Sequence, residues 1–288
     1  MDPKARVLLV NPWIYDFAAH NLGIEPLGLL TIAAVLRDNG YQVAVIDCLG
    51  PHPRMPRSRP DGSGKFLKAP VDAPAAISSV PRRYGRYGLP VADFERALAT
   101  TPRPDLVMVA SGMTYWYLGV FEAIRRIRAR FGHVPLALGG VYASLCPDHA
   151  RLNSGADVVL QGPATAAALR LADEVAGVAS DPARYADPRN WPAPAHELVP
   201  RSYAGLVTSW GCPFRCTYCA SRRLQPAFVQ RDPNLVIEEI TTCARRGIRH
   251  FAFYDDALLV DAQGHITPIL EGVLDRGFGV RLHSPNGL

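Results

Sequence analysis

The chain has 288 residues, of which 48% are hydrophobic and 20% charged, and its mean hydropathy is +0.02. This composition excludes an intrinsically disordered protein, which would be poorer in apolar residues. The longest apolar stretch, residues 29–36, is too short to cross a bilayer, so we expect no membrane partner. A net charge of +5 is a weak argument for nucleic acid, and we expect none to bind.

The cysteines and the N-terminus bear on the compartment. Asn11-Pro12 interrupts the first apolar run and no signal-peptide cleavage site follows, so we expect a cytoplasmic protein. Three of the six cysteines fall within one short stretch, at Cys212, Cys216 and Cys219. In a reducing compartment, clustered cysteines indicate metal ligands and scattered ones indicate small core residues. The scattered ones are Cys48, Cys146 and Cys243.

The first half of the chain alternates short apolar strands with amphipathic helices. The patterns predict strands at residues 6–11, 42–47, 105–110, 134–138 and 156–160. They predict helices near residues 26–38, 116–131, 143–152 and 164–175. Such alternation implies right-handed crossovers and a parallel sheet covered on both faces. We therefore expect an α/β, doubly wound domain over residues 1–178, with its ligand at the carboxyl ends of the strands.

Two proline-rich segments interrupt this pattern. Residues 50–103 contain nine prolines and many arginines, and a long insertion of this kind is usually functional or disordered. Its stretch 82–87 either covers an anionic ligand or is a solvated surface excursion. Residues 179–202 are predicted to be an interdomain linker. A second α/β unit, residues 203–288, follows with three strands and two helices, and Asp232 is expected to cap the first of these helices.

The most informative stretch is WGCPFRCTYC, residues 210–219, directly after the first strand of this second unit. Its CxxxCxxC spacing puts three thiolates on one loop. A structural zinc site would need a fourth ligand and usually has paired CxxC or histidine spacings. A cubane held by three cysteines instead leaves one iron open to an external ligand. The spacing therefore favours a redox-active 4Fe-4S cluster on Cys212, Cys216 and Cys219, with zinc as the alternative.

With this loop the chain resembles the radical S-adenosylmethionine (radical SAM) superfamily, whose CxxxCxφC loop follows the first strand of a (β/α) barrel. The resemblance implies a 4Fe-4S cluster whose open iron binds SAM and cleaves it to a 5′-deoxyadenosyl radical. It also implies that Tyr218, at the aromatic position φ, contacts the adenine. The family's Gly-Gly-Glu segment, which binds the SAM amino group, is replaced here by Tyr254-Asp255-Asp256. We expect Asp255 first and Asp256 second to take that role, unless one of them caps the next helix.

A doubly wound domain before such a barrel resembles the cobalamin-binding subfamily, and this resemblance covers essentially the whole chain. It implies a corrinoid across the carboxyl edge of the first sheet, where small residues admit a flat macrocycle. The implied contacts are Asn11-Pro12, Ser111, Gly112, Met113, Gly139 and Gly140. The DxHxxG loop that supplies an axial histidine is absent, since the chain reads NPWIYD after the first strand. Cobalamin should therefore bind without a histidine from that loop; alternatively, the domain serves only as a scaffold or for substrate binding.

The predicted fold is thus an N-terminal doubly wound domain (Rossmann- or flavodoxin-like, of the cobalamin-binding type) plus an incomplete radical SAM (β/α) barrel. The favoured function is cobalamin-dependent radical SAM catalysis, with C-methylation as the reaction. We expect a small-molecule or peptide substrate and an electron donor such as flavodoxin or ferredoxin. The alternatives are a cobalamin-independent rearrangement or cyclisation, and a non-catalytic protein that holds a cluster or corrinoid. A partial barrel also predicts an exposed edge strand near residues 280–283 and proteolysis within the linker.

Overall fold

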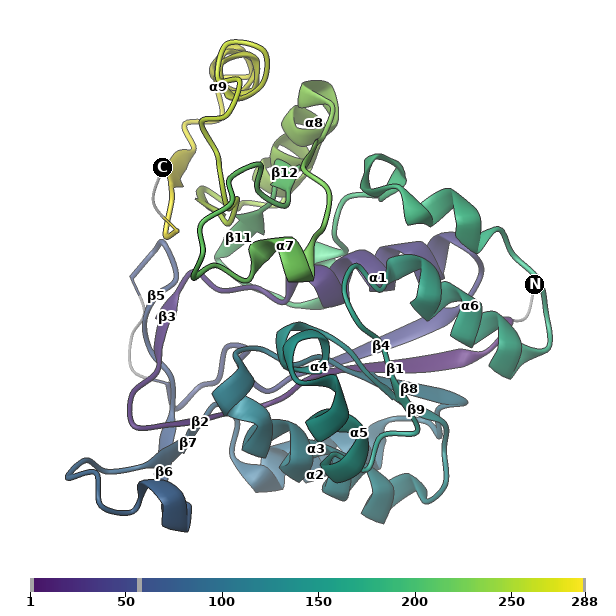
Figure 1. The fold of residues 1–288 in the computed structure, drawn as a ribbon. Helices are drawn as coiled ribbons and strands as arrows, with labels where there is room; N and C mark the ends of the chain where they lie inside the picture. The colour runs from purple at the N-terminus through teal and green to yellow at the C-terminus, as the bar shows by residue number, and fades with distance from the viewer. Residues whose placement is uncertain (1–2, 56–58, 287–288) are drawn as a thin grey trace.

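The first sheet has the strand order of a doubly wound fold. The computed structural model describes residues 3–55 and 59–286 (Figure 1). Its first sheet contains β1 (Arg6–Asn11), β4 (Gln42–Asp47), β8 (Leu106–Val109), β9 (Leu136–Leu138) and β10 (Val158–Val159). The strands are parallel and lie in the order β10-β9-β8-β1-β4, so the order reverses between β1 and β8. This is the flavodoxin-like arrangement, and it confirms the predicted α/β class.

Helices cover both faces of this sheet (Figure 1). One layer consists of α1 (Leu27–Asp38) and α6 (Thr165–Ala176). The other consists of α2 (Val91–Thr100), α3 (Tyr117–Phe131), α4 (Val141–Leu145) and α5 (Pro147–Asn153). The predicted helix over 143–152 is therefore two helices, because Pro147 starts a new one. None of the helices in the described part of the chain is long and apolar enough to cross a bilayer.

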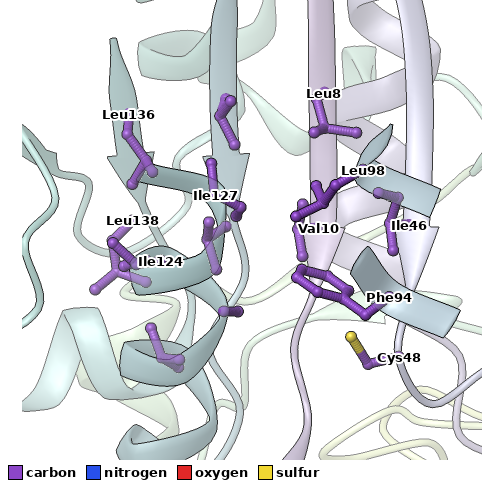
Figure 2. Close-up of a cluster of buried hydrophobic side chains, with 14 of the residues drawn as sticks. Leu8, Val10, Ile46, Cys48, Phe94, Leu98, Ile124, Ile127, Leu136 and Leu138 are labelled. Carbon is purple, nitrogen blue, oxygen red and sulfur yellow. The ribbon is translucent and has the colours of Figure 1, made fainter. Parts of the chain in front are cut away.

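The core follows from the alternation of side chains along each strand. Val7 and Leu9 of β1 pack under α1, whereas Leu8 and Val10 pack on the opposite face. Figure 2 shows this opposite layer, with side chains of α2 and α3 against the strands. The residues labelled there are Leu8, Val10, Ile46, Cys48, Phe94, Leu98, Ile124, Ile127, Leu136 and Leu138. The apolar strand runs in the sequence are thus buried on both sides.

The second unit is built on its own parallel sheet. It contains β11 (Tyr203–Leu206), β14 (His250–Phe253) and β15 (Arg281–His283), in the order β11-β14-β15. The helices α8 (Pro233–Arg245) and α9 (Ile266–Asp275) pack on it. Asp232 caps α8 as predicted, accepting a 2.8 Å hydrogen bond from the Asn234 amide, and Cys243 is buried in the core. Two parallel sheets in succession are the fold that the sequence predicts.

The described residues of the insertion at 50–103 are more ordered than their sequence suggests. It contains β5 (Ser63–Lys65), β6 (Lys68–Pro70), the 3-10 turn η1 (Ala75–Ile77) and β7 (Gly85–Tyr87). β7 pairs antiparallel with β6 and with β2 (Ile14–Asp16), and β5 pairs antiparallel with β3 (His20–Leu22). Phe66 and Tyr87 are buried against Ile14 and Leu49. Part of stretch 82–87 is therefore strand β7 with a buried tyrosine rather than a solvated excursion.

The predicted linker, residues 179–202 and called the strap below, packs against the first unit through several buried side chains. It forms three 3-10 turns, η3 (Pro182–Ala186), η4 (Pro188–Asn190) and η5 (His196–Leu198). A further 3-10 turn, η2 (Thr114–Trp116), lies outside this segment and follows β8. Tyr185 and Trp191 are buried beside α1 and α6, and Val199 is also buried. The prolines shorten the regular structure, but the apolar residues between them still find a core. Exposed residues such as Arg184, Arg189 and Asn190 alternate with these buried ones, so the segment is anchored at intervals rather than free along its length.

Candidate functional site

The three cysteines lie on the loop between the first strand of the second sheet and a short helix. After β11, the two-residue strand β12 (Ser209–Trp210) pairs with β13 (Val229–Gln230), and α7 (Ser221–Leu224) lies within the hairpin. Cys212 is half-buried, while Cys216 and Cys219 are exposed. The hairpin therefore presents the motif outward from the start of the second unit.

Gly211 is the residue that lets the loop leave β12. Its φ is +76°, and a Cβ there would lie 2.4 Å from the carbonyl oxygen of Ala227. Any larger residue would both strain the backbone and collide with the opposite arm of the hairpin. The position directly before Cys212 is thus fixed as glycine by local geometry.

The thiols of the three motif cysteines do not converge on one point. Within residues 3–55 and 59–286, no three His, Cys, Asp or Glu side chains are arranged to hold a metal ion. The Ser221 hydroxyl lies 3.2 Å from Cys219 Sγ, and the Ser221 amide donates to the same sulfur at 3.5 Å. These contacts lower the pKa of the Cys219 thiol and favour the thiolate that binds metals. Three thiols on one exposed loop are a suitable donor set for an iron–sulfur cluster.

A cavity of about 540 Å³ lies at the carboxyl edge of the first sheet. It opens where the strand order reverses, next to the ends of β1 and β8, which is where doubly wound sheets bind ligands. Its wall continues to Trp210 and Gly211, directly before the first cysteine. It also contains every residue implied for the corrinoid except Met113: Asn11, Pro12, Ser111, Gly112, Gly139 and Gly140.

Hydrogen bonds and close backbone packing join the Ser111 loop to the Gly139-Gly140 turn. Ser111 Oγ donates to the carbonyl of Gly139 at 2.6 Å and accepts from the Ala143 amide at 3.2 Å. Gly140 has φ +97°, and a Cβ there would lie 2.3 Å from the Ser111 carbonyl oxygen. In contrast, a Cβ on Gly139 would meet only Leu160, at 3.9 Å. Ser111 and Gly140 therefore shape the edge, while Gly139 leaves room for a flat ligand; their cofactor role stays a prediction.

The two aspartates predicted to bind SAM have different surroundings. Asp255 is 3% exposed and accepts hydrogen bonds from the amides and hydroxyls of both Thr208 and Ser209, at 2.6–3.0 Å to Oδ1. It thereby ties the end of β14 to the end of β11, and it caps no helix. Asp256 is exposed and lies in the cavity wall. This geometry makes Asp256, rather than Asp255, the better candidate for a ligand ammonium group.

Tyr218 and the three cysteines lie outside the cavity wall. Tyr218 is 91% exposed, so the adenine contact implied for it stays a prediction. The wall itself carries two carboxylates, Glu25 and Asp256, and no Lys, Arg or His of the described chain lines it. Corrinoid binding without an imidazole from the first loop stays a prediction. All four tryptophans of the chain line the cavity: Trp13, Trp116, Trp191 and Trp210.

A buried chain of alternating charges links the two units. Glu25 Oε2, from the segment before α1, accepts from the Gly205 amide at 2.8 Å and lies 2.9 Å from His196 Nδ1. His196 Nε2 lies 3.0 Å from Glu239 Oε1, and Arg231 donates to Glu239 Oε2 at 2.6 Å. Arg231 also donates to the carbonyl of Val207, at 2.7 Å, shortly before the cysteine loop. The network thus joins the cavity wall, the strap and the root of the loop.

A second buried ion pair fastens the same junction. Arg201 binds Asp47, at the end of β4, and donates to the Tyr203 hydroxyl. Asp47 also accepts from Asn11 Nδ2 at 2.7 Å, which brings the ends of β1 and β4 into the contact. Neither this pair nor the His196 network was predicted from the sequence. Bonded partners in them lie up to 180 residues apart, and a lone histidine in a proline-rich segment gives no sign of its partners.

The fold defined by these two sheets, a doubly wound domain followed by a second parallel sheet, is shared with enzymes of known structure. Among solved structures, the radical SAM methyltransferase TsrM from Kitasatospora setae, with tryptophan substrate and a SAM analogue bound, covers 96% of this chain with a TM-score of 0.63. The identity is 19%, and the match spans 54% of TsrM.

OxsB, a cobalamin-dependent SAM radical enzyme solved with aqua-cobalamin and SAM, also covers 96% of the chain. Its TM-score is 0.61 at 15% identity, and the match spans 38% of OxsB. The chain thus spans about half or less of the length of these relatives. No family model matches the sequence, and no curated protein does. At this identity the likeness establishes the fold.

Proposed function

We propose that this protein is a cytoplasmic, cobalamin-dependent radical SAM enzyme that methylates carbon. Cys212, Cys216 and Cys219 would hold a 4Fe-4S cluster, and the cavity would hold the corrinoid and SAM. When bound, the cluster with SAM supplies hydrogen-atom abstraction and the corrinoid supplies a methyl group. The substrate would be a small molecule or a peptide.

One observation carries the proposal. The CxxxCxxC loop leaves the first strand of a parallel sheet and starts at the wall of the same cavity that collects Ser111, Gly112, Gly139 and Gly140. A cluster on this loop and a flat ligand on the sheet edge would therefore be neighbours. A zinc-stabilised loop gives no reason for such a cavity, nor for an exposed three-thiol motif.

The chain's own residues would divide the work. Gly139 gives the corrinoid access to the backbone, and Asp256 offers a carboxylate to the SAM ammonium group. Trp191 and Trp210 pack edge to face, with their ring centroids 4.7 Å apart, and would shield the side of the cavity nearest the loop from water. Glu25 and Arg231, held through His196 and Glu239, fix the distance between the cavity and the loop.

An electron donor is part of the proposal. The cysteines are flanked by Arg215, Arg222 and Arg223, all exposed, and there is no acidic residue between Glu197 and Asp232. A positively charged loop would attract an acidic redox protein such as flavodoxin or ferredoxin and raise its association rate.

Anaerobic reconstitution with iron and sulfide tests the proposal. Wild type should bind about four irons per chain, as a 4Fe-4S cluster on three cysteines requires, with absorbance near 400 nm and a reduced-cluster EPR signal that SAM perturbs. Cys216→Ala should lose the cluster, and Cys146→Ala, a half-buried cysteine outside the motif, should keep it. One zinc per chain without visible absorbance, or a full cluster in Cys216→Ala, would overturn the assignment.

A further inference from the structure

Thr165 carries an unpaired hydroxyl in the wall of the cavity. The residue is 4% exposed and lines the cavity at the start of α6. Among the described residues its Oγ1 has no hydrogen-bond partner, and this oxygen is not one of the fully enclosed unpaired atoms, so it stays accessible from the cavity. The other buried hydroxyls of the wall are engaged, Ser111 with Gly139 and Ser209 with Asp255. The side chain is almost fully buried, yet its hydroxyl keeps its hydrogen-bonding capacity free on the cavity side, so Thr165 points to a ligand.

The first turn of α6 adds unpaired backbone donors beside this hydroxyl. Its N-cap is Ala164, which provides no side-chain cap, and the first turn holds no acidic residue. The first hydrogen bond of the turn runs from the Ala168 amide to the Ala164 carbonyl, at 2.8 Å. Within the described part of the chain, the amides of Thr165, Ala166 and Ala167 therefore stay unpaired at the positive end of a 12-residue helix.

The turn before α6 is held in place. The Gly162 amide donates to Ser144 Oγ at 2.9 Å, and Ser144 Oγ donates to the Gly140 carbonyl at 2.7 Å. Ser144 thus connects this turn to the Gly139-Gly140 edge. The N-terminus of α6 is therefore preorganised relative to the part of the wall that is expected to hold the corrinoid.

The charges in the cavity wall determine where an anionic group of a ligand would bind. Glu25 and Asp256 are the charged residues that line the cavity within the described chain, and both are acidic. An anionic group in the cavity would be repelled from both. The free end of α6, which favours negative charge through its dipole and amides, is then the place where such a group would bind.

We propose that Thr165 and the first turn of α6 bind an anionic oxygen of the ligand, a phosphodiester or a carboxylate. The hydroxyl and the free amides donate hydrogen bonds to it. The inference rests on the proposed function, under which two ligands offer this chemistry: cobalamin through the phosphodiester of its nucleotide loop, and SAM through its carboxylate.

The test compares Thr165→Val with wild type in four anaerobic binding titrations. Cobalamin is paired with cobinamide, which lacks the nucleotide loop, and SAM with methylthioadenosine, which lacks the carboxylate. Loss of a hydrogen bond to a charged group should weaken binding about tenfold or more. We expect Thr165→Val to bind either cobalamin or SAM more weakly, with unchanged binding of the matching compound, cobinamide or methylthioadenosine. The ligand whose binding weakens identifies the anionic group.

Thr31→Val is the matched control, because Thr31 is also a buried helical threonine but bonds to the Leu27 carbonyl and lies outside the wall. The inference is overturned if Thr165→Val binds all four ligands like wild type, or if Thr31→Val or the truncated ligands show the same loss. Should wild type bind neither cofactor, the proposed function fails. The anion site at Thr165 is then tested by thermal denaturation with inorganic phosphate, which should raise the Tm of wild type but not of Thr165→Val. If phosphate does not raise the Tm of wild type, the proposed anion site is wrong.

Discussion

His196 Nδ1 lies 2.9 Å from Oε2 of Glu25, so a histidine of the proline-rich strap is bonded to a carboxylate of the cavity wall. Burial alone would lower the pKa of His196, but hydrogen bonds to Glu239 and Glu25, and their charges, raise it to about 10. The histidine is therefore cationic at neutral pH and lies between two carboxylates.

This charge predicts a pH dependence of stability. The folded protein holds a proton on His196 that the unfolded chain releases above a pKa of about 6.5. The stabilisation is therefore complete below pH 6.5 and declines as the pH rises toward 10. Urea unfolding at pH 6.5 and 8 should give a smaller free energy of unfolding at the higher pH. His196→Gln should be less stable at pH 6.5 and show a weaker dependence; equal slopes would contradict the network.

The neighbouring aspartates should separate into a structural and a binding residue. Asp255→Asn replaces an oxygen that accepts from Thr208 and Ser209, which should cost about 1–3 kcal/mol of stability. Asp256→Asn should change stability by less than about 0.5 kcal/mol and weaken SAM binding. Chemical denaturation and SAM titration of both variants measure the two effects. An Asp255→Asn protein that folds normally and loses only SAM binding would restore the order expected from the sequence.

Local patterns predicted one part of this molecule well and another poorly. Runs such as residues 6–11 are buried on both faces, and this gave the parallel sheet and its class. The antiparallel pairing of β2 with β7 joins Ile14 to Tyr87, and no local pattern specifies a partner so far along the chain. The roles of Asp255 and Asp256 depend in the same way on Thr208, which is 47 residues from Asp255. The CxxxCxxC spacing lies within one loop and could be interpreted from the sequence, and its cluster role stays a prediction. Contacts that the fold creates between distant residues could not be predicted.

Gly211→Ala should disable the cysteine loop without touching a cysteine. The alanine Cβ would lie 2.4 Å from the Ala227 carbonyl oxygen at a φ of +76°. We expect a loss of about 1–3 kcal/mol of stability and a lower iron content after reconstitution. Gly177→Ala is a control, because it also has positive φ but no neighbour within 4 Å of the added Cβ. Iron binding should fall in the first variant and stay unchanged in the second.

Limited proteolysis should spare the strap. Trp191 and Val199 are buried, and His196 is bonded to both units, so cleavage within residues 179–202 requires these contacts to open first. Mass spectrometry of early fragments should place few cuts there. In His196→Gln the same segment should become sensitive. Rapid cleavage of the wild-type strap would show that the two units are joined more loosely than their hydrogen bonds suggest.

Cobalamin, if bound, should lack a histidine ligand. Histidine is absent from the cavity wall in the described chain, and residues 11–16 contain none. The EPR spectrum of the Co(II) state should show no hyperfine splitting from an imidazole nitrogen. Splitting of that kind would mean that a histidine from elsewhere enters the cavity when the corrinoid binds.

The position of the four tryptophans makes the cavity its own optical reporter. All tryptophan fluorescence of the protein originates at the cavity wall, because the wall contains each of its tryptophans: Trp13, Trp116, Trp191 and Trp210. A corrinoid or an iron–sulfur cluster absorbs in the region of that emission and would quench it by energy transfer. Filling of the site can therefore be followed by intrinsic fluorescence on unlabelled protein, with hardly any background from the rest of the molecule.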